Sequence, residues 1–134
     1  MTNDLTARLA DEKFVSLTTY KKNGDAVASP MWIGRDGDAL VMWTPAETWK
    51  VRRVRRDPRV RLSACGRTGR VDTSQPALTG QAELIDDDRE VLRIESIIKR
   101  KYGFVYRVMT VVEAIAARGR KPRVGLRISA LHPA

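Results

Sequence analysis

The stretch WTPAETWKVRRVRRDPRVRL, from Trp43 to Leu62, changes its hydrophobic period twice and decides the fold. It leaves a strand, passes through a short helix and enters a second strand. Thr44-Pro45-Ala46-Glu47 has the form of a helix-capping box with proline at the first helical position. Thr48 is an alternative N-cap four residues later, so the sequence leaves the start of the helix open between these two positions.

Inside this stretch the apolar residues have helical spacing. Val51 and Val54, with Trp49 as a third candidate, would face the protein interior on one side of the helix. The helix must end just before Pro58, because proline disfavours helical geometry in the residue that precedes it. The segment RVRLSACG then alternates between apolar and polar residues, which predicts a strand.

Five further segments are rich in β-branched and aromatic residues and are bounded by turn residues, which predicts strands. Asn23-Gly24 is a hairpin turn, because both residues tolerate positive φ. Pro30 cannot donate to a strand ladder and marks an edge, a bulge or an opening in the sheet. From their spacing we expect the first three strands to form a meander. The five segments are Lys13–Tyr20, Ala26–Gly34, Ala39–Thr44, Ala77–Ile85 and Arg123–Ser129.

Two longer helices are predicted before the last strand. Asp87 and Glu90 have the spacing of an N-cap and a capping box, and Gly103 can end that helix. The segment VYRVMTVVEAIAARG predicts a second helix that closes at Gly119. The order of elements therefore favours a mostly-β fold, a small and mainly antiparallel barrel of about six strands with helices packed outside. We expect one domain over residues 1–134.

Composition excludes several classes of site. The chain has 134 residues, a net charge of +9, one cysteine and one histidine. It cannot form an internal disulfide, and a Ser-His-Asp triad or a histidine-rich metal site is disfavoured. Cys65 is interpreted as a structural thiol, His132 as inert, and the acidic run Asp86–Glu90 as a negatively charged helix start rather than a metal site. No signal peptide or ~20-residue apolar span is recognisable, so we expect a cytoplasmic protein without a membrane segment.

The basic helix is a candidate phosphate site. Lys50 and Arg53 are three residues apart and project from the same side of a helix. The helix start adds free backbone N–H groups and a positive dipole end, and the hydroxyls of Thr44 and Thr48 add donors. The alternative is a basic helix that only faces water, and spacing alone does not separate the two.

The segment SPMWI, Ser29 to Ile33, is a candidate ring-binding site. Pro30, Met31 and Trp32 could line a slot for a planar ring, and the backbone groups freed by the proline could bond to the edge of a heterocycle. The alternative for Met31 and Trp32 is core packing.

Three segments together resemble a known family: FVSLTTYKKNGDAVASPMWI, WTPAETWKVRRVRRDPRVRL and the later KYG at Lys101–Gly103. They resemble the pyridoxamine 5′-phosphate oxidase-like superfamily, and within it the small flavin- or deazaflavin-dependent (coenzyme F420-dependent) oxidoreductases of actinobacteria. The resemblance implies a split β-barrel of the FMN-binding type and a homodimer with cofactor sites between subunits. It also implies that the cofactor performs the hydride chemistry, so no catalytic side chain is expected.

Carried over by position, Lys50 and Arg53 would hold the cofactor phosphate, and Pro30, Met31 and Trp32 would flank the ring. The loop around Arg67 and the last strand would close the site from the partner subunit. The long segment that binds pyridoxal phosphate in true pyridoxamine-phosphate oxidases is not recognisable, which disfavours that activity. The expected cofactor-binding residues are Pro30, Met31, Trp32, Thr44, Thr48, Trp49, Lys50, Arg53 and Arg67.

The expected cofactor is F420, with FMN as the alternative. A polyglutamate tail on the deazaflavin gives it more negative charge than FMN, and the surplus of arginine favours it. Arg52, Arg56 and Arg59 could instead face only water. A non-catalytic protein that binds flavin, haem or another tetrapyrrole remains a further alternative. Nucleic-acid binding is disfavoured, because the tryptophans precede the arginines rather than alternate with them.

Overall fold

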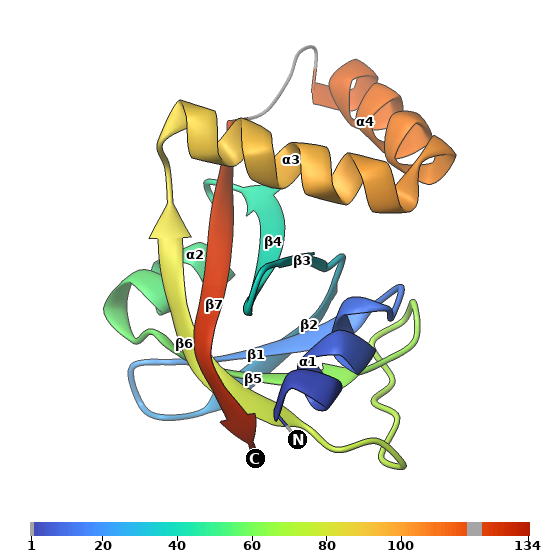
Figure 1. Ribbon diagram of the computed structural model, residues 1–134. Coiled ribbons are helices and arrows are strands. Elements are labelled where there is room, and N and C mark those ends of the chain that lie inside the picture. Colours follow the sequence, from blue (N-terminus) through green and yellow to red (C-terminus); the bar gives the residue numbers. More distant parts are fainter. Residues whose placement is uncertain (1, 118–121) are drawn as a thin grey trace.

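The computed structural model describes residues 2–117 and 122–134. Figure 1 shows long strands wrapped into a barrel, with helices on its outside. The elements in chain order are α1 Thr2–Ala10, β1 Val15–Tyr20, β2 Ala26–Met31, β3 Gly34–Asp36, β4 Ala39–Pro45, α2 Trp49–Arg56, β5 Arg59–Ala64, β6 Leu78–Ile85, α3 Asp88–Tyr102, α4 Phe104–Ala117 and β7 Arg123–Pro133.

The strands form one antiparallel sheet of seven strands in the order β2-β1-β5-β6-β7-β4-β3. The two edge strands, β2 and β3, are consecutive in the chain and are separated only by Trp32 and Ile33. The barrel is therefore closed by the chain itself at this point rather than by a strand ladder. The predicted mostly-β, mainly antiparallel split barrel is confirmed, and Pro30 lies in an edge strand as expected.

The predicted meander is wrong. β1 and β2 do form the expected hairpin, in which Tyr20 pairs with Ala26 and Gly24 has a φ of +92°. The next long strand, β4, pairs with β7 and with the short β3, not with β2. The cause lies at residues 32 and 33, where the backbone N–H of Ile33 donates to the Tyr102 hydroxyl at 2.9 Å instead of to a strand. The chain thus leaves one edge of the sheet and re-enters at the other.

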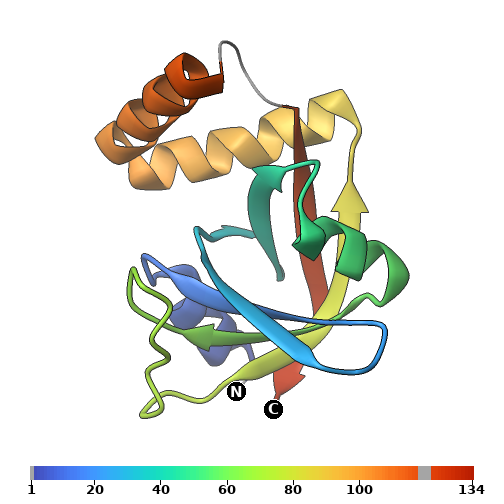
Figure 2. The ribbon, with the colours of Figure 1, turned by 180° about the vertical axis from the view of Figure 1, so that it is seen from behind.

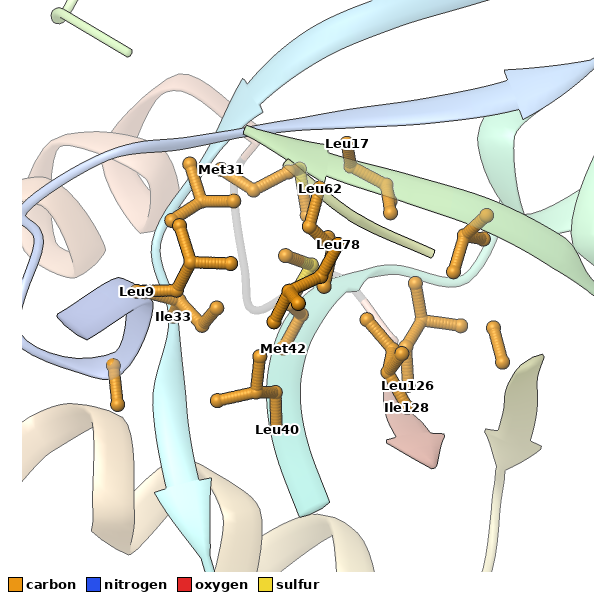
Figure 3. Packing of buried hydrophobic residues seen from close by; sticks show 14 of the residues in the cluster. Leu9, Leu17, Met31, Ile33, Leu40, Met42, Leu62, Leu78, Leu126 and Ile128 are labelled. Atoms are coloured by element: carbon orange, nitrogen blue, oxygen red, sulfur yellow. The ribbon is translucent and has the colours of Figure 1, made fainter. Parts of the chain in front are cut away.

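Two apolar clusters fill the fold. The larger lies inside the barrel, where Leu17 of β1 meets Met42 and Leu126 of the neighbouring strands β4 and β7 (Figure 3). The smaller lies between the outer face of β4 and the helices α3 and α4, and contains Trp43, Ile94 and Tyr106. In both ribbon views α1 and α2 lie on opposite sides of the barrel, and α3 and α4 lie together across its top (Figures 1 and 2). None of the helices in the described ranges is long and apolar enough to cross a membrane.

The start of α2 corrects one expectation. Thr44 and Pro45 belong to β4, so they are not a helix cap, and α2 begins at Trp49. Thr48 occupies the N-cap position but its hydroxyl donates to the Pro45 carbonyl at 3.3 Å instead of capping the helix. Trp49 does not face inward, because its side chain is 68% exposed.

The inward face of α2 is otherwise as predicted, since Val51 and Val54 are buried. The start of α3 is also confirmed, because the Asp87 side chain accepts from the Glu90 backbone N–H at 3.2 Å. Gly103, with a φ of +55°, ends the helix as predicted. α1 was not predicted, β7 runs four residues further than expected, and Gly119 lies outside the described residues.

Two side chains at the end of α3 stabilise the segment where the barrel closes. Lys101 Nζ donates to the carbonyls of Ala10 and Glu12, both at 2.6 Å, and of Ile33 at 2.8 Å. The Tyr102 hydroxyl accepts from Ile33 N–H and donates to the Lys13 carbonyl at 2.8 Å. These two side chains therefore join α1, the start of β1 and the link between the edge strands.

We expect Gly80→Ala to lower the free energy of unfolding by about 2 kcal/mol. An ideal Cβ at Gly80 would lie 2.8 Å from the backbone oxygen of Ser129, and backbone in a sheet cannot easily move. Gly66→Ala is the matched control, because its Cβ would meet nothing within 4 Å. Urea denaturation of the three proteins measures the difference, and equal midpoints would contradict the close packing of β6 on β7.

Candidate functional site

Three cations gather at the start of α2. Lys50 and Arg53 lie on α2, and Arg123 is the first residue of β7. The pKa of Lys50 lies below its ordinary value of 10.5, first because the side chain is partly buried and then because Arg53 and Arg123 repel its charge. An anion that binds beside a lysine in this environment stabilises its charged form.

Local structure explains this arrangement. Burial of Val51 and Val54 fixes the rotation of α2 about its axis. Arg53 Nε donates to the buried Thr19 hydroxyl at 2.7 Å, which anchors α2 to β1. Arg123 pairs with Pro45 in the ladder of β4 and β7, and its guanidinium carbon lies 4.1 Å from the centre of the Trp43 ring. Helix and sheet thus present their positive charges to the same region.

Two buried polar atoms at the end of β4 have no hydrogen-bond partner among the described residues. They are the Thr44 hydroxyl oxygen and Trp43 Nε1. A buried unpaired group of this kind costs about 1–3 kcal/mol. Thr44 is adjacent to the turn that leads into α2, so an anion held by Lys50 and Arg53 could also accept from its hydroxyl. The residues present therefore fit a phosphate group.

We expect Lys50→Met to raise the free energy of unfolding of the cofactor-free protein at neutral pH. Because the pKa of Lys50 is lowered on folding, its charged form is less stable in the folded chain than in the unfolded chain. This penalty is complete below the lowered pKa, shrinks as the pH rises from there towards 10.5, and is absent above that value. Urea denaturation should show a gain at neutral pH that disappears in strong alkali. A loss at neutral pH would mean that Lys50 contributes mainly by packing.

The second predicted group, Pro30, Met31 and Trp32, lies at the other end of β1. Pro30 is exposed and pairs with Ser16, whereas Met31 is buried in the barrel core. The burial of Met31 agrees with the packing alternative. Trp32 stacks on Tyr102, with ring centroids 4.5 Å apart and planes 11° from parallel. The structure thus gives this segment one exposed residue, one core residue and one stacked aromatic ring.

Arg67 lies in an exposed turn beside this second group. The turn is closed by a bond from Gly69 N–H to the Gly66 carbonyl, and a Cβ on Gly69 would lie 3.4 Å from Pro30 Cδ. The turn therefore packs next to Pro30 within the same subunit. Its predicted role toward a partner subunit stays a prediction.

The predicted site residues therefore form two groups rather than one cluster. Ser16, opposite Pro30, and Thr19, bonded to Arg53, are three residues apart on β1. At about 3.3 Å per residue the groups are separated by roughly 10 Å along the strand. A flavin or deazaflavin carries its ring and its phosphate at opposite ends of a ribityl chain, so two separated groups fit such a molecule.

The remaining basic residues of the run have local contacts. Arg52 lies over the Trp49 ring at 4.9 Å, and Arg56 donates to the Tyr20 carbonyl. Arg59 pairs with Asp57 at 2.8 Å. Arg52, Arg56 and Arg59 are all exposed, which agrees with the expectation that they face water.

Two other singled-out residues lie away from α2. Burial, followed by the charge of Glu12, raises the pKa of Cys65, which disfavours a reactive thiolate. His132 lies near the end of β7, with Nε2 2.7 Å from the Thr79 hydroxyl and Nδ1 2.9 Å from the Ala130 carbonyl. Arg123 at the other end of the strand is roughly 30 Å away at the usual rise per residue.

The sequence did not indicate Thr19 or the particular role of Arg123. A lone threonine in a strand carries no signal, since its partner is 34 residues away. Arg123 was indicated only weakly, through its position at the start of the last strand, which was expected to help close the site.

A family model described as pyridoxamine 5′-phosphate oxidase matches residues 1–131. No curated protein sequence matches the chain. Among solved structures, the chain is similar to a conserved hypothetical protein from Mycobacterium tuberculosis, with 22% identity, a TM-score of 0.69 and coverage of 97% of this chain and 81% of the other.

Two further structures carry more informative names. An F420 reductase has 16% identity, a TM-score of 0.56 and coverage of 93% of this chain and 94% of the other. The haem storage protein HutZ from Vibrio cholerae has 12% identity, a TM-score of 0.65 and coverage of 97% and 92%. At these identities the likeness shows the fold alone.

Proposed function

The chain belongs to the pyridoxamine 5′-phosphate oxidase family, and from this premise we propose that it is an oxidoreductase that uses the reduced deazaflavin coenzyme F420. The substrate would be a small organic molecule that accepts a hydride. The proposal rests mainly on the cation cluster of Lys50, Arg53 and Arg123 and on the unpaired Thr44 hydroxyl near the end of β4, where the chain turns towards α2.

In this proposal the residues at α2 bind the phosphate of the cofactor. Lys50 supplies a positive charge that partial burial and the neighbouring arginines destabilise, so an anion is favoured beside it. Arg53 is oriented by its hydrogen bond to Thr19. Thr44 donates its hydroxyl proton, while Thr48 and Trp49 line the start of the helix. A charged donor to phosphate is worth more than a neutral one, so Lys50 and Arg53 carry most of the affinity.

The segment at residues 30–32 would position the ring. Pro30 is exposed on the edge strand β2. Trp32 is held in place by its stacking on Tyr102. When bound, the reduced ring supplies the hydride, and the protein supplies position and exclusion of water. This division of roles between cofactor and protein agrees with a site that consists of phosphate-binding and packing residues.

The surplus of positive charge supports F420 over FMN. Arg52, Arg55 and Arg56 are exposed on the helix that carries Lys50. A polyglutamate tail could reach these residues, whereas FMN has no comparable group. One of the structural neighbours is an F420 reductase, which is compatible with this choice. An FMN-dependent oxidoreductase of the same fold is the alternative.

Haem binding is the other alternative, since HutZ shares the fold. The single histidine of the chain does not favour it, because both ring nitrogens of His132 lie within hydrogen-bonding distance of other groups, far from α2. A haem protein of this chain would need another axial ligand.

We expect F420 to bind more tightly than FMN at low salt, and this advantage to shrink as salt rises. Contacts to an exposed tail are each worth under ~1 kcal/mol and are screened over about 8 Å at physiological ionic strength. Fluorescence titration of both cofactors at low and high salt tests this. Equal affinities at low salt would remove the charge argument, and tighter FMN binding at both salts would favour the alternative. Binding of haem alone would overturn the oxidoreductase proposal.

A further inference from the structure

Basic side chains from three elements surround Tyr20 at the end of β1. The Tyr20 carbonyl accepts from Arg56 of α2, and the guanidinium carbon of Arg59 on β5 lies 5.2 Å from the centre of the Tyr20 ring. Both ribbon views show the turn after β1 lying close to α2 (Figures 1 and 2). The Tyr20 surface, as it is called here, consists of Tyr20, Lys21, Lys22, Arg56, Arg59 and Arg61.

The pairing of β1 with β5 brings these residues together. Alternate residues of β5 are buried in the barrel core, so Arg59 and Arg61 lie on its outer face, where both are exposed. Thr18 pairs with Arg61, and two residues further along both strands Tyr20 lies beside Arg59. The tryptophans precede the arginines in the sequence, but the sheet places a different aromatic ring, from a distant segment, among them.

Arg59 is held as an exposed planar group. Its Nε and Nη2 donate to the two carboxylate oxygens of Asp57 at 3.0 and 2.8 Å, while its guanidinium carbon lies over the Tyr20 ring. The Arg59 side chain is nevertheless 66% exposed. A guanidinium held in this way is ordered before a ligand arrives, and a nucleic-acid base can stack on its plane.

The other cations of the Tyr20 surface are available to an anion. Lys21, Lys22 and Arg61 are exposed, and none of the ion pairs within the described residues involves them. Lys21 and Lys22 directly follow Tyr20 in the chain, whereas Arg61 is two residues beyond Arg59 on the same face of β5. Positive charges thus lie on both sides of the planar group.

We propose that the Tyr20 surface binds single-stranded nucleic acid. This inference goes beyond the proposed function and does not depend on it. Phosphates contact Lys21, Lys22 and Arg61, and a base stacks on Arg59. Proteins that bind single strands without sequence preference combine a basic surface with stacking groups of this kind. The net charge of +9 favours the approach of such a polyanion.

Other anionic partners are less suitable. A double strand keeps the faces of its bases within the stack, and an acidic protein segment offers carboxylates in place of bases, so both would leave the plane of Arg59 unused. A membrane surface would require large apolar side chains that insert between the lipids. None of the large apolar side chains that are exposed in the described residues belongs to the Tyr20 surface.

The test measures the fluorescence anisotropy of a labelled oligothymidylate of about 12 nucleotides at several salt concentrations. The double variant Lys22→Gln/Arg61→Gln should bind at least tenfold more weakly than the wild type. Its slope of log affinity against log salt should be about 1.4 smaller, because each lost phosphate contact contributes about 0.7. Lys99→Gln/Arg100→Gln is the matched control, since it removes the same charge from the exposed last turn of α3. Equal losses in the two double variants would overturn the inference, because the charge would then act diffusely.

Arg59→Lys separates stacking from charge. Lysine keeps the positive charge but lacks the planar group, so this variant should bind at least threefold more weakly with an unchanged salt slope. Wild-type affinity in Arg59→Lys, or displacement of the oligonucleotide by polyglutamate of equal total charge, would indicate a surface for any polyanion and overturn the inference. Tighter binding of a duplex, or no binding at low salt, would overturn it as well. Circular dichroism checks that all variants are folded.

The outcomes separate this inference from the proposed function. Lys22→Gln/Arg61→Gln should bind F420 or FMN with wild-type affinity, because neither residue lies at the start of α2. A loss of cofactor affinity in this variant would assign the two residues to the cofactor site and overturn the inference. Oligonucleotide binding by a protein that binds neither cofactor would support the inference and overturn the function.

Discussion

Replacing Lys50 by methionine should weaken cofactor binding roughly ten- to a hundredfold. A charge-assisted hydrogen bond to phosphate contributes about 1.5–3 kcal/mol, and about 1.4 kcal/mol corresponds to a factor of ten. Methionine keeps most of the side-chain volume, and Lys50 already carries an energetic penalty in the folded protein. The same substitution is therefore expected to stabilise the empty protein while it removes binding, as happens when a functional group is maintained at a cost to stability.

Arg53→Met should weaken binding by a similar factor, but it should also destabilise the fold, because Arg53 Nε bonds to Thr19. Arg55→Met is the matched control, since Arg55 is an exposed arginine on the same helix and its contact to a cofactor tail is worth under ~1 kcal/mol, which is less than a tenfold change in affinity. Isothermal titration calorimetry of the three variants and the wild type provides the comparison. Equal losses for Lys50, Arg53 and Arg55 would show that the charge of α2 acts diffusely and that there is no specific phosphate site.

Replacing Lys101 by methionine should lower the free energy of unfolding by about 3 kcal/mol. The ammonium group bonds to three backbone carbonyls from three segments, at 2.6, 2.6 and 2.8 Å. Without the ammonium group the three carbonyls would lose their common hydrogen-bond donor. Breaking a network of charged hydrogen bonds is one of the mechanisms behind large mutational losses of stability. α1 and the link at Ile33 would lose their common attachment.

Lys99→Met controls for the loss of a charge, because Lys99 is exposed in the same last turn of α3. Urea denaturation followed by circular dichroism measures both variants, and hydrogen exchange reports whether α1 opens first. If Lys101→Met and Lys99→Met have the same small effect, the three carbonyls are satisfied by water and the closure of the barrel does not depend on Lys101.

Much of the fold could be predicted where the signal is local. The Asn23-Gly24 hairpin, the Asp87 cap and the Gly103 helix end all follow from the chemistry of a few neighbouring residues, and the structure confirms each of them. The inward position of Val51 and Val54 follows from helical spacing. α1 was missed because its sequence is polar and lacks a strong periodic signal, although Leu9 reaches the core.

The candidate site was predictable only in part. Lys50 and Arg53 share one short helix, so their proximity follows from spacing. Arg123 joins them because β7 pairs with β4, and that pairing links residues about 80 positions apart. Trp49 was a candidate for the interior, yet it lies outside, because it is two positions before the buried Val51 and at about 100° per residue faces nearly the opposite side of α2.

The sequence by itself determined the order of the long strands and helices apart from α1 and the short β3, as well as the main turns and the basic character of α2. The tertiary structure decided which strands are neighbours and how the barrel closes. It joined the sheet's two edges through Trp32 and Ile33 and fixed them with Lys101 and Tyr102. The physical reason is that turns and caps are set by interactions within a few residues, whereas strand partners are chosen by burial and hydrogen bonding between distant segments.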